Sequence, residues 1–381
     1  MTGDDASRSA AADASAVVPA PVRTLQHVAE LAGVSVKTAS RALNDEPYVA
    51  PATAARVRDA AARAGYRVNA TARDLRRGAP SPLVGLVSAD LANPFYSRLA
   101  AGIEREIRPA GLLLVTSSSD EDPDAERAVV ASLLERQVRA LVVVSTTETH
   151  EHLAEERRPG TPLVMVDRSG SVEDADSVTL DNRAGARAAA EHLLTCSSGA
   201  PRLSVVTDLR RLETGRARLA GVADALHAAG LDPLGADRVR EAHDVRSAER
   251  AVAELLAADP PPTAVLAMNN RLATGAVRAV AAAGERGARV AVAGFDDLEL
   301  AAQVGLTVVA YDAEEMGRAV GRLVLERVRG ERGPARRVVV PTTLVVNSPC
   351  GRGHGADAGL PAGAGRGHDR VTSLTPETAP A

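Results

Sequence analysis

Two patterns of hydrophobic and polar positions divide the chain. From residue 83 onward, short apolar runs alternate with longer segments whose apolar positions recur at helical spacing. The runs expected to form strands are residues 83–88, 112–118, 140–145, 162–167, 177–180, 202–207, 264–268 and 289–295. The segments expected to form helices are residues 95–108, 123–137, 183–195, 214–229, 245–257 and 271–284. This alternation predicts doubly wound parallel sheets, and the number of runs predicts two sheets with a ligand cleft between them.

Residues 24–66 follow the pattern of three short helices instead. In the segment TLQHVAELA, apolar residues recur at the spacing i, i+3, i+4, i+7 and predict one buried face. The segments SVKTASRAL, with Ser35 as N-cap, and PATAARVRDAAARAG predict the second and third helices. Only GVS separates the first two. Two short helices joined by a tight turn form a helix-turn-helix, whose second helix enters the major groove of DNA.

Charge is unevenly distributed along the chain. Residues 23–78 carry ten basic and five acidic side chains, a net charge of +5, whereas the whole chain has −4, which leaves −9 for the remainder. A small basic head on an acidic body is typical of nucleic-acid binding, although a basic face can also be plain solvated surface. Lys37 is the single lysine among 45 basic residues and lies on the second predicted helix. The alternative to a functional reason is that codon composition makes lysine rare and that its position is due to chance.

Several classes of protein are disfavoured. No apolar run reaches 18 residues, and the N-terminus lacks the pattern of a signal peptide, so we expect a cytoplasmic protein. Cys196 and Cys350 lie far apart and predict neither a disulfide framework nor a metal site. His150 and His152 are interpreted as surface residues of a polar loop. No phosphate-binding loop or nucleophile motif is present, so we expect no catalytic residue, no metal and no cofactor.

The head and the body together resemble a known family. The segments TLQHVAELAGVSVKTASRALN and GYRVNATARDLRRG are similar to the DNA-binding head and hinge of the LacI/GalR transcription regulators. Downstream, NPFYSRLAAGIE, PLVMVDRS, VTLDNRAGARAAAEHLL, NNRLATGAVRAV and VAVAGFDD occur in the order that this family has. The resemblance covers residues 24–347, roughly 85% of the chain.

The resemblance implies an architecture and a set of domain boundaries. It implies an all-α helix-turn-helix head with a hinge helix, joined to a two-lobed α/β body that is similar to periplasmic sugar-binding proteins and has parallel sheets. The expected domains are a disordered extension (1–22), the head (23–68), the hinge helix and linker (69–82), the body (83–347) and a disordered tail (348–381). Within the body we expect a first lobe of about 83–180 plus 310–328 and a second lobe of about 181–309 plus 329–347.

The resemblance also assigns residues to DNA. The residues expected to read base edges are Val36, Lys37 and Arg41, since Lys and Arg donate to guanine and Val can meet a thymine methyl group. Four polar residues are placed to bind phosphates: Thr24, Ser40, Asn44 and Thr53. The alternative is a plain amphipathic core helix.

The hinge is expected to respond to DNA. Asn69 is a plausible N-cap, and Ala72 and Leu75 lie three residues apart on one helical face. The resemblance implies that Leu75 inserts into the minor groove at the centre of the operator. A helix of about nine residues is marginal alone, so its folding can depend on DNA and on how the lobes are held, whereas a simple linker is the alternative.

The remaining candidates belong to the cleft. Only six residues are aromatic, and four of them, Phe95, Tyr96, Phe295 and Tyr311, fall at predicted strand ends beside the cleft. Sugar sites combine aromatic faces with polar side chains that bond hydroxyl groups. The positions that match effector-binding residues of the family are Asp167, Arg218, Asn269 and Asp296, which with Phe95, Tyr96 and Tyr311 form the expected effector site. The alternative for Asp296 is a turn cap.

Three departures from the family pattern bear on these expectations. Asn269 is followed by Asn270 where the family commonly has Asp, and Tyr311 stands where a glutamine is frequent. Both departures leave the identity of the effector open. Ala50 replaces the usual capping Ser or Thr of the third helix, a change that can destabilise the head by about 1 kcal/mol.

We therefore expect a sequence-specific transcription regulator, most simply a repressor. It would bind a pseudo-palindromic operator as a homodimer or larger assembly, under the control of a sugar-like effector and without contact with a membrane. The resemblance allows an effector either to release DNA or to promote its binding. Two other classes were weighed: a sugar carrier, which leaves residues 24–78 unexplained, and an enzyme on the same fold, for which the sequence assembles no base and nucleophile.

Overall fold

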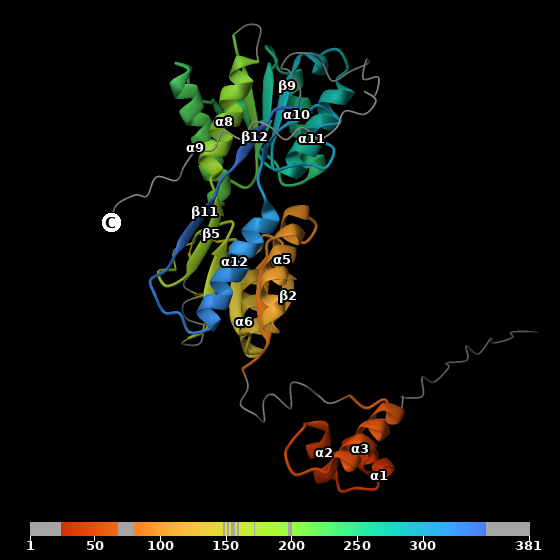
Figure 1. Ribbon diagram of the computed structural model, residues 1–381. Helices are drawn as coiled ribbons and strands as arrows, with labels where there is room; N and C mark the ends of the chain where they lie inside the picture. Colours follow the sequence, from red (N-terminus) through yellow and green to blue (C-terminus); the bar gives the residue numbers. More distant parts are fainter. Residues whose placement is uncertain are drawn as a thin grey trace, which may run out of the picture. The chain divides into compact units, whose positions relative to one another are not determined.

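The computed structural model describes residues 24–67 and 80–347, apart from short gaps at 148, 151, 154–156, 158–159, 171 and 197–199. The chain divides into two compact units, residues 1–81 and 82–381. We call their described parts the head and the body, and Figure 1 shows both. The expected hinge residues Asn69, Ala72 and Leu75 lie outside the described residues.

The head consists of three helices around one small apolar core. They are α1 (Leu25–Ala32), α2 (Val36–Leu43) and α3 (Pro51–Ala64). The side chains of Thr24 and Ser35 accept hydrogen bonds from the first turns of α1 and α2, and Ser35 was predicted as an N-cap. Ala50 makes no such bond, so α3 begins without a side-chain cap. Alanine and valine side chains of all three helices form the core, with Val28 and Val57 fully buried.

The body contains two six-stranded sheets, one in each lobe. The order of strands is β11-β5-β4-β3-β1-β2 in the first and β12-β10-β9-β8-β6-β7 in the second. The strands of the first sheet are β1 (Leu83–Ser88), β2 (Leu113–Ser118), β3 (Ala140–Val143), β4 (Leu163–Val166), β5 (Asp176–Leu180) and β11 (Arg337–Val340). Those of the second are β6 (Leu203–Thr207), β7 (Val239–Glu241), β8 (Ala264–Ala267), β9 (Ala291–Phe295), β10 (Thr307–Ala310) and β12 (Thr343–Val345). Neighbouring strands run parallel in both described sheets, except that β10 pairs with β12 in the antiparallel direction. The two lobes thus follow similar plans.

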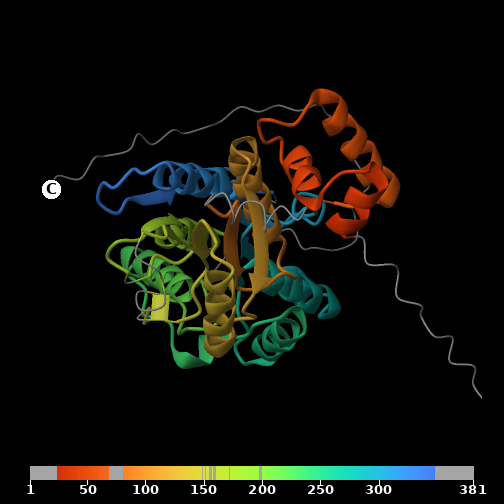
Figure 2. The ribbon, with the colours of Figure 1, turned by 90° about the horizontal axis from the view of Figure 1, so that it is seen from below.

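Helices cover both faces of the first sheet. The helices α5 (Pro94–Ile107) and α12 (Ala313–Val328) pack together on one face, and α6 (Pro123–Glu135) covers the other (Figure 2). A short turn of 3-10 helix, η1 (Arg108–Ala110), follows α5. Two glycines allow the close approach of α5 and α12, because a Cβ at Gly102 would lie 2.0 Å from the Glu314 carbonyl oxygen and one at Gly317 2.1 Å from that of Leu99.

The second lobe has the same layering. The helices α8 (Asn182–Thr195) and α9 (Glu213–Ala228) cover one face of the sheet, and α10 (Val245–Ala257) and α11 (Asn270–Ala282) cover the other. Two short 3-10 helices, η2 (Ala236–Arg238) and η3 (Gly287–Arg289), precede β7 and β9. None of the described helices has the length and apolar character that a membrane crossing requires.

The chain passes between the lobes three times, and the last passage corrects the expected boundary. The first two passages follow β5 and β10, close to residues 181 and 310. Residues 329–347 were expected in the second lobe, which is wrong for β11, because this strand pairs with β5 in the first sheet. The physical reason is buried Asp176, which accepts hydrogen bonds from Arg327 Nη2 at 2.7 Å and from the Arg336 backbone N at 2.8 Å.

A further expectation from the sequence, that two histidines lie on the surface, is also wrong. His150 and His152 are each only 5% exposed, rather than lying on the surface. His152 Nε2 donates to Oε1 of buried Glu126 at 3.0 Å, so the histidine satisfies a carboxylate inside the first lobe.

Candidate functional site

A narrow polar cleft lies between the two lobes, where the carboxyl ends of the central strands of both sheets face each other. Its volume is about 50 Å³. The expected residues Phe95, Tyr96, Asp167, Arg218, Asn269, Asp296 and Tyr311 all line it. Other charged or polar residues that line it were not predicted: Asp90, Asn93, Glu121, Arg168, Asp208, Thr214, His243 and Arg271. The structure therefore brings the candidate effector residues together in one place.

Two aspartates occupy equivalent positions in the two lobes. Asp167 directly follows β4 and Asp296 directly follows β9, each the third strand of its sheet. Both have a left-handed backbone, with φ of 68° and 69°. This conformation is uncommon for residues other than glycine, and Asp tolerates it better than most. A strained backbone at the same point of two related lobes is typical of residues held in place for function.

Asp296 is the better paired of these two carboxylates. Its Oδ1 accepts a hydrogen bond from the Tyr311 hydroxyl at 2.7 Å, and its Oδ2 accepts one from the backbone N of Asn270 at 3.2 Å. Arg218 Nη2 lies 3.8 Å from Oδ1. Asp296 thus joins the start of α11 to the passage after β10.

Arg218 is held rigidly on α9. Its Nε donates to Asn182 Oδ1 at 2.7 Å and its Nη1 donates to the carbonyl oxygen of Met268. The guanidinium carbon lies 3.8 Å from the centre of the Phe295 ring, which places the cation over an aromatic face. With 7% exposure and three anchors, Arg218 presents its remaining nitrogen to the cleft in a fixed orientation.

Asp167 has much weaker partners. The Tyr96 hydroxyl lies 3.5 Å from its Oδ2, and Arg168 Nε lies 3.8 Å away. Burial raises the pKa of Asp167 to about 6, although Arg168 and Arg218 act in the opposite direction. Asp167 is consequently a buried carboxylate with capacity to accept more hydrogen bonds.

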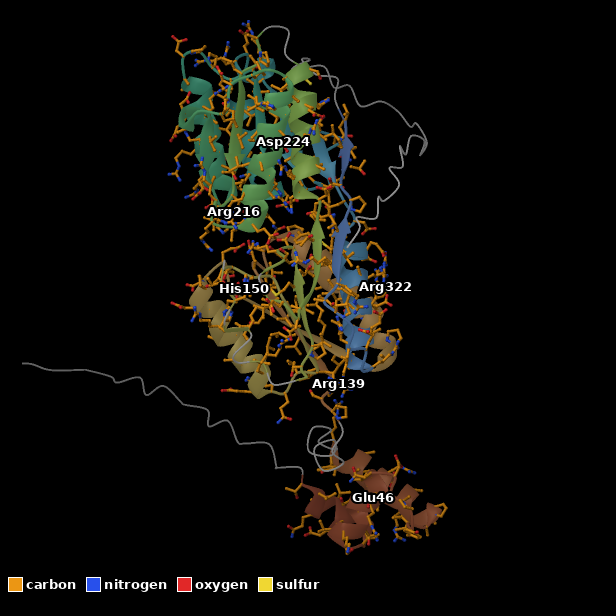
Figure 3. All side chains as sticks on the ribbon, turned by 90° about the vertical axis from the view of Figure 1, so that its left-hand side faces the viewer. Glu46, Arg139, His150, Arg216, Asp224 and Arg322 are labelled. Carbon is orange, nitrogen blue, oxygen red and sulfur yellow. The ribbon has the colours of Figure 1, made fainter. Side chains whose placement is uncertain are left out.

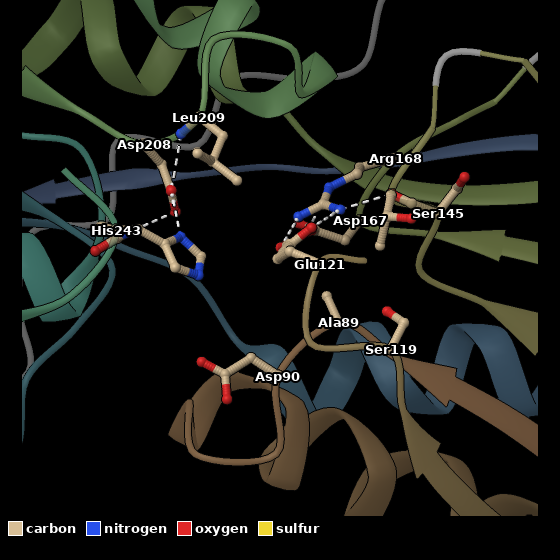
Figure 4. Close-up of polar contacts among 12 residues, drawn as sticks. Ala89, Asp90, Ser119, Glu121, Ser145, Asp167, Arg168, Asp208, Leu209 and His243 are labelled. Atoms are coloured by element: carbon tan, nitrogen blue, oxygen red, sulfur yellow. Dashed lines mark hydrogen bonds and ion pairs between the residues drawn. The ribbon is translucent and has the colours of Figure 1, made fainter. Parts of the chain in front are cut away.

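Arg168 and Glu121 form a buried ion pair at one side of the cleft (Figure 4). Arg168 Nη1 and Nη2 donate to the two Glu121 oxygens at 2.9 and 2.6 Å. Arg168 Nη1 also donates to the Ser145 carbonyl oxygen at 2.5 Å. The pair connects the loops that follow β2, β3 and β4. Sequence reasoning missed both residues, because a pair between distant loops leaves no spacing signal.

A second polar group lies across the cleft. Asp208, directly after β6, has its Oδ1 2.9 Å from His243 Nδ1, and its Oδ2 accepts from Asn269 Nδ2 at 2.7 Å (Figure 4). The hydrogen bond with Asp208 raises the pKa of His243. The position of Asp208 at a strand end was a usable signal in the sequence. His243 follows the short strand β7, which the apolar pattern did not predict.

Aromatic rings form one wall of the cleft. The ring centres of Phe95 and Tyr96 lie 4.8 Å apart, and those of Phe95 and Tyr311 lie 5.8 Å apart, both edge to face. Phe295 and Tyr311 are 6.5 Å apart. Phe95, Tyr96 and Tyr311 line the cleft, whereas fully buried Phe295 lies behind them. A cluster of aromatic rings is typical of a pocket that binds an organic ring.

In the head, α2 exposes part of the expected DNA-reading surface. Val36 is 46% exposed and Lys37 is also exposed, and the Lys37 ammonium makes no hydrogen bond or ion pair within the described residues. Arg41 is partly exposed, and its Nε lies 3.5 Å from Glu46 Oε2. The buried face of α2 is formed by Ala39 and Ala42, so the exposed residues are available to a partner.

The expected phosphate-binding residues differ in accessibility. Thr24 is exposed, and Ser40 and Thr53 are partly exposed. Asn44 is only 7% exposed, and its amide donates to the Ser40 hydroxyl at 3.3 Å. Asn44 is therefore packed into the end of α2 in the described head.

Comparison with known proteins covers both units. Residues 24–69 match the family model of bacterial regulatory proteins of the lacI family, and residues 81–348 match that of periplasmic binding proteins and the sugar binding domain of the LacI family. The HTH-type transcriptional regulator PtxS of Pseudomonas aeruginosa is 33% identical over 328 residues, which covers 85% of this chain and 94% of that protein. The ribose operon repressor of Escherichia coli is 29% identical, covering 80% and 93%.

Solved structures agree with this assignment. The lac repressor dimer bound to operator and the anti-inducer ONPF is similar with a TM-score of 0.71 and 26% identity, over 86% of this chain and 98% of that one. The complex of the transcriptional regulator CelR with cellobiose has a TM-score of 0.63 and 29% identity, over 86% and 99%. The fold class predicted from the sequence is thereby confirmed.

Proposed function

Because the chain belongs to the LacI family, whose members are DNA-binding transcriptional regulators with a sugar-binding domain and not enzymes, we propose that it is a repressor controlled by a small-molecule effector. In this proposal two copies bind a pseudo-palindromic operator, and the effector binds in the interlobe cleft. The observation that carries the proposal is the convergence of Asp167, Arg218, Asn269 and Asp296 with three aromatic residues on one cleft.

The head supports the DNA-binding part of the proposal. The exposed face of α2 offers Val36, Lys37 and Arg41 to base edges, and Thr24 and Ser40 are accessible to phosphates. Lys37 is exposed without a partner among the described residues, so no ion pair has to be broken when its ammonium approaches guanine. We assign the hinge residues Asn69, Ala72 and Leu75 to the operator on the strength of the family pattern alone. The operator lies on chromosomal or plasmid DNA, which places the action of the protein in the cytoplasm.

The charges of the cleft favour an uncharged effector that is rich in hydroxyl groups. Each guanidinium group that lines the cleft already faces a carboxylate: Arg168 faces Glu121, Arg271 faces Asp90 and Arg218 faces Asp296. An anionic effector group would therefore have to compete with a carboxylate for each guanidinium group of the described cleft. Asp167, in contrast, has spare capacity as an acceptor, which hydroxyl donors of a sugar can fill.

The relatives support this chemistry. One solved relative contains cellobiose, and one curated relative is named as the repressor of a ribose operon. Both names refer to neutral sugars. We therefore infer a neutral sugar or sugar derivative as the effector of this chain.

Binding also requires the cleft to widen. The cleft volume of about 50 Å³ is far below the roughly 300–1,000 Å³ of pockets that enclose a drug-sized ligand. A sugar ring needs several times that volume. We infer that effector binding is linked to movement of the two lobes, and that this movement changes the affinity for DNA.

A thermal-shift screen with a matched pair of variants tests the proposal. The full chain is heated with neutral sugars, sugar phosphates and nucleobases, and each compound that stabilises it is then added to operator-bound protein. Arg218→Ala should lose both the thermal shift and the DNA response while the free protein still binds operator. The control Arg187→Ala changes an exposed arginine of α8 whose one ion pair among the described residues is with Glu191, and it should behave like the wild type. An unchanged dose response in Arg218→Ala would remove Arg218 from the site.

A further inference from the structure

The two lobes contact each other directly at one side of the cleft through Arg211 and Glu213, which do not line it. Arg211, in the loop before α9 of the second lobe, reaches two main-chain carbonyl groups of the first lobe. Its Nη1 donates to the Thr146 oxygen at 2.5 Å and its Nη2 donates to the Glu121 oxygen at 2.7 Å. Because the acceptors are main-chain atoms, the contact depends on the positions of the two loops and not on their side chains.

A second contact between the lobes lies two residues along the chain. Glu213, the first residue of α9, accepts a hydrogen bond from the Ser169 backbone N at 2.8 Å. Its two oxygens also accept from the Ser169 hydroxyl, each at 3.0 Å. Arg211 and Glu213 both border a separate cavity of about 280 Å³ between the lobes. His150 and Arg216, which also line this cavity, mark the facing ends of the two lobes in Figure 3.

The loops that receive these bonds are themselves anchored in the first lobe. The Thr146 backbone N and hydroxyl donate to Oε2 of fully buried Glu126 at 2.5 and 2.9 Å. The Glu121 carboxylate is held by Arg168. Because the acceptors cannot follow Arg211 if the lobes separate, the bonds exist only when the lobes are close together.

We propose that Arg211 and Glu213 form an interlobe clamp: they hold the lobes together and set the balance between closed and open cleft without touching the effector. When the cleft opens, the two hydrogen bonds donated by the Arg211 guanidinium group break, and so do the one or two accepted by the Glu213 carboxylate. They form again when the cleft closes. Opening also frees the path that an effector needs to reach the narrow cleft. The clamp therefore governs how fast a bound effector escapes, a consequence that rests on the proposed function.

Hydrogen exchange at Ser169 tests the clamp without any effector. The Ser169 amide is bonded to Glu213 and not to Arg211, so it reports on separation of the lobes when Arg211 alone is changed. In the full-length protein, Arg211→Met should raise the exchange rate of the peptide that contains Ser169 by about tenfold or more, because opening then breaks two fewer charged hydrogen bonds. Arg210→Met, which changes the exposed neighbouring arginine, is the matched control and should exchange like the wild type.

Two further readouts separate the clamp from general destabilisation. Peptides from the buried strands β3 and β8 should exchange equally in all variants, and Arg211→Lys should restore part of the protection at Ser169, because an ammonium can still donate to carbonyl groups. Equal exchange at Ser169 in Arg211→Met and Arg210→Met would overturn the proposal. So would faster exchange that extends equally over β3 and β8.

The effector consequence is measured separately. With a stabilising compound from the screen, Arg211→Met should raise the dissociation rate constant about tenfold or more while the cleft residues stay unchanged. If the screen finds no effector, the proposed function fails but the exchange result still decides the clamp. An effector that dissociates equally fast from Arg211→Met and Arg210→Met would show that the clamp does not control release.

Discussion

At the scale of single residues, the cleft is organised around carboxylates whose surroundings differ. Asp296 is bonded by a hydroxyl and a backbone amide, whereas Asp167 has only distant partners. The two occupy equivalent strand ends, so the difference comes from their neighbours and not from the fold. A buried carboxylate without good partners destabilises the folded state, and its retention in a cleft is typical of a residue that a ligand completes.

Replacing this carboxylate should stabilise the protein and remove effector binding. The pKa of Asp167 is raised to about 6 from an ordinary value near 3.8. A raised pKa means that stability falls as pH rises from about 4 to 6, as the buried group ionises. Asp167→Asn should therefore raise the free energy of unfolding at pH 7 by about 2–3 kcal/mol, with little difference below pH 4. Urea titrations of the full chain at both pH values measure this.

The control for this experiment is Asp232→Asn, which changes an exposed aspartate in the loop after α9. It should leave the unfolding free energy almost unchanged. A loss of stability in Asp167→Asn at pH 7 would show that the carboxylate is well satisfied without a ligand.

The prediction for the head concerns the replacement of Lys37. Lys37→Ala should weaken binding to the operator by about 1–3 kcal/mol and relax the base preference at one position of each half-site. Binding to a panel of operators with single base changes, at fixed salt, measures the effect. An equal loss on random duplex DNA would instead mean that Lys37 contacts only phosphate. Lysine is a flexible donor, so Lys37→Arg should alter the preference and not restore it.

Residue patterns in the sequence located part of this site. The scarcity of aromatic residues made Phe95, Tyr96 and Tyr311 conspicuous, and family positions indicated Arg218. Two pairs were not predicted from the sequence: Arg168 with Glu121 and His243 with Asp208. Each pair joins loops that only the folded sheets bring together. The burial of His152 was not predicted, because the sequence of a polar loop does not show that the loop packs against a buried glutamate.

At the scale of elements, β11 shows how a few polar contacts place a strand. The chain leaves α12 and pairs with β5 in the first sheet, although a simple two-lobe division at the end of α12 would send it to the second. Asp176 binds Arg327 of α12 and Arg336, which directly precedes β11, and its side chain is fully buried. This cluster fixes the edge of the first sheet.

Removing the Asp176 charge should loosen this edge. Burial alone would raise the pKa of Asp176, but hydrogen bonds from Arg327 and Arg336 hold it down at about 2. A lowered pKa stabilises the fold above about pH 4, and this contribution is lost as pH falls from 4 toward 2. Asp176→Asn should thus lower the unfolding free energy at pH 7 by about 2 kcal/mol, and the difference from wild type should shrink at pH 3.

Asp224→Asn serves as the comparison, because it breaks the exposed pair with Arg183 and should change stability far less. Denaturant unfolding of both variants at pH 7 and pH 3 supplies the measurement. A difference between Asp176→Asn and wild type that is as large at pH 3 as at pH 7 would contradict the role of the ionised carboxylate.

The apolar pattern predicted most elements near the cleft and missed those at the lobe passages. The strands from β1 to β6, together with β8 and β9, and the helices α5, α6, α8, α9, α10 and α11 lie within a few residues of their expected positions. Three of the missed strands, β7, β11 and β12, lie at sheet edges and are not buried, so they need no continuous apolar run. The fourth, β10, is as apolar and as long as β3, and its run could have been predicted. The helix α12 has apolar residues at helical spacing, such as Met316, Val320 and Leu323, and a full count of periodicity would have found it.

At the scale of the whole molecule, the proposed function joins a DNA-binding head to a body whose lobes would close on a small ligand. In this proposal the body has two states, closed and open, and both the effector and the clamp of Arg211 and Glu213 shift the balance between them. Effector and operator then act on one equilibrium, so each changes the affinity for the other by the same factor. No single element carries this property, since it requires the head, the cleft and their connection in one chain.

The most direct test of this account is the affinity of the full-length protein for a duplex selected from a random pool, measured by fluorescence anisotropy with and without the stabilising sugar. We predict tight binding to a pseudo-palindromic sequence, much weaker binding to a scrambled duplex at the same salt, and a shift of about 5–150-fold when the sugar is added. Arg218→Ala should bind the same duplex without the shift. Equal affinity for selected and scrambled DNA, or no change with a sugar that binds the cleft, would contradict the central claim.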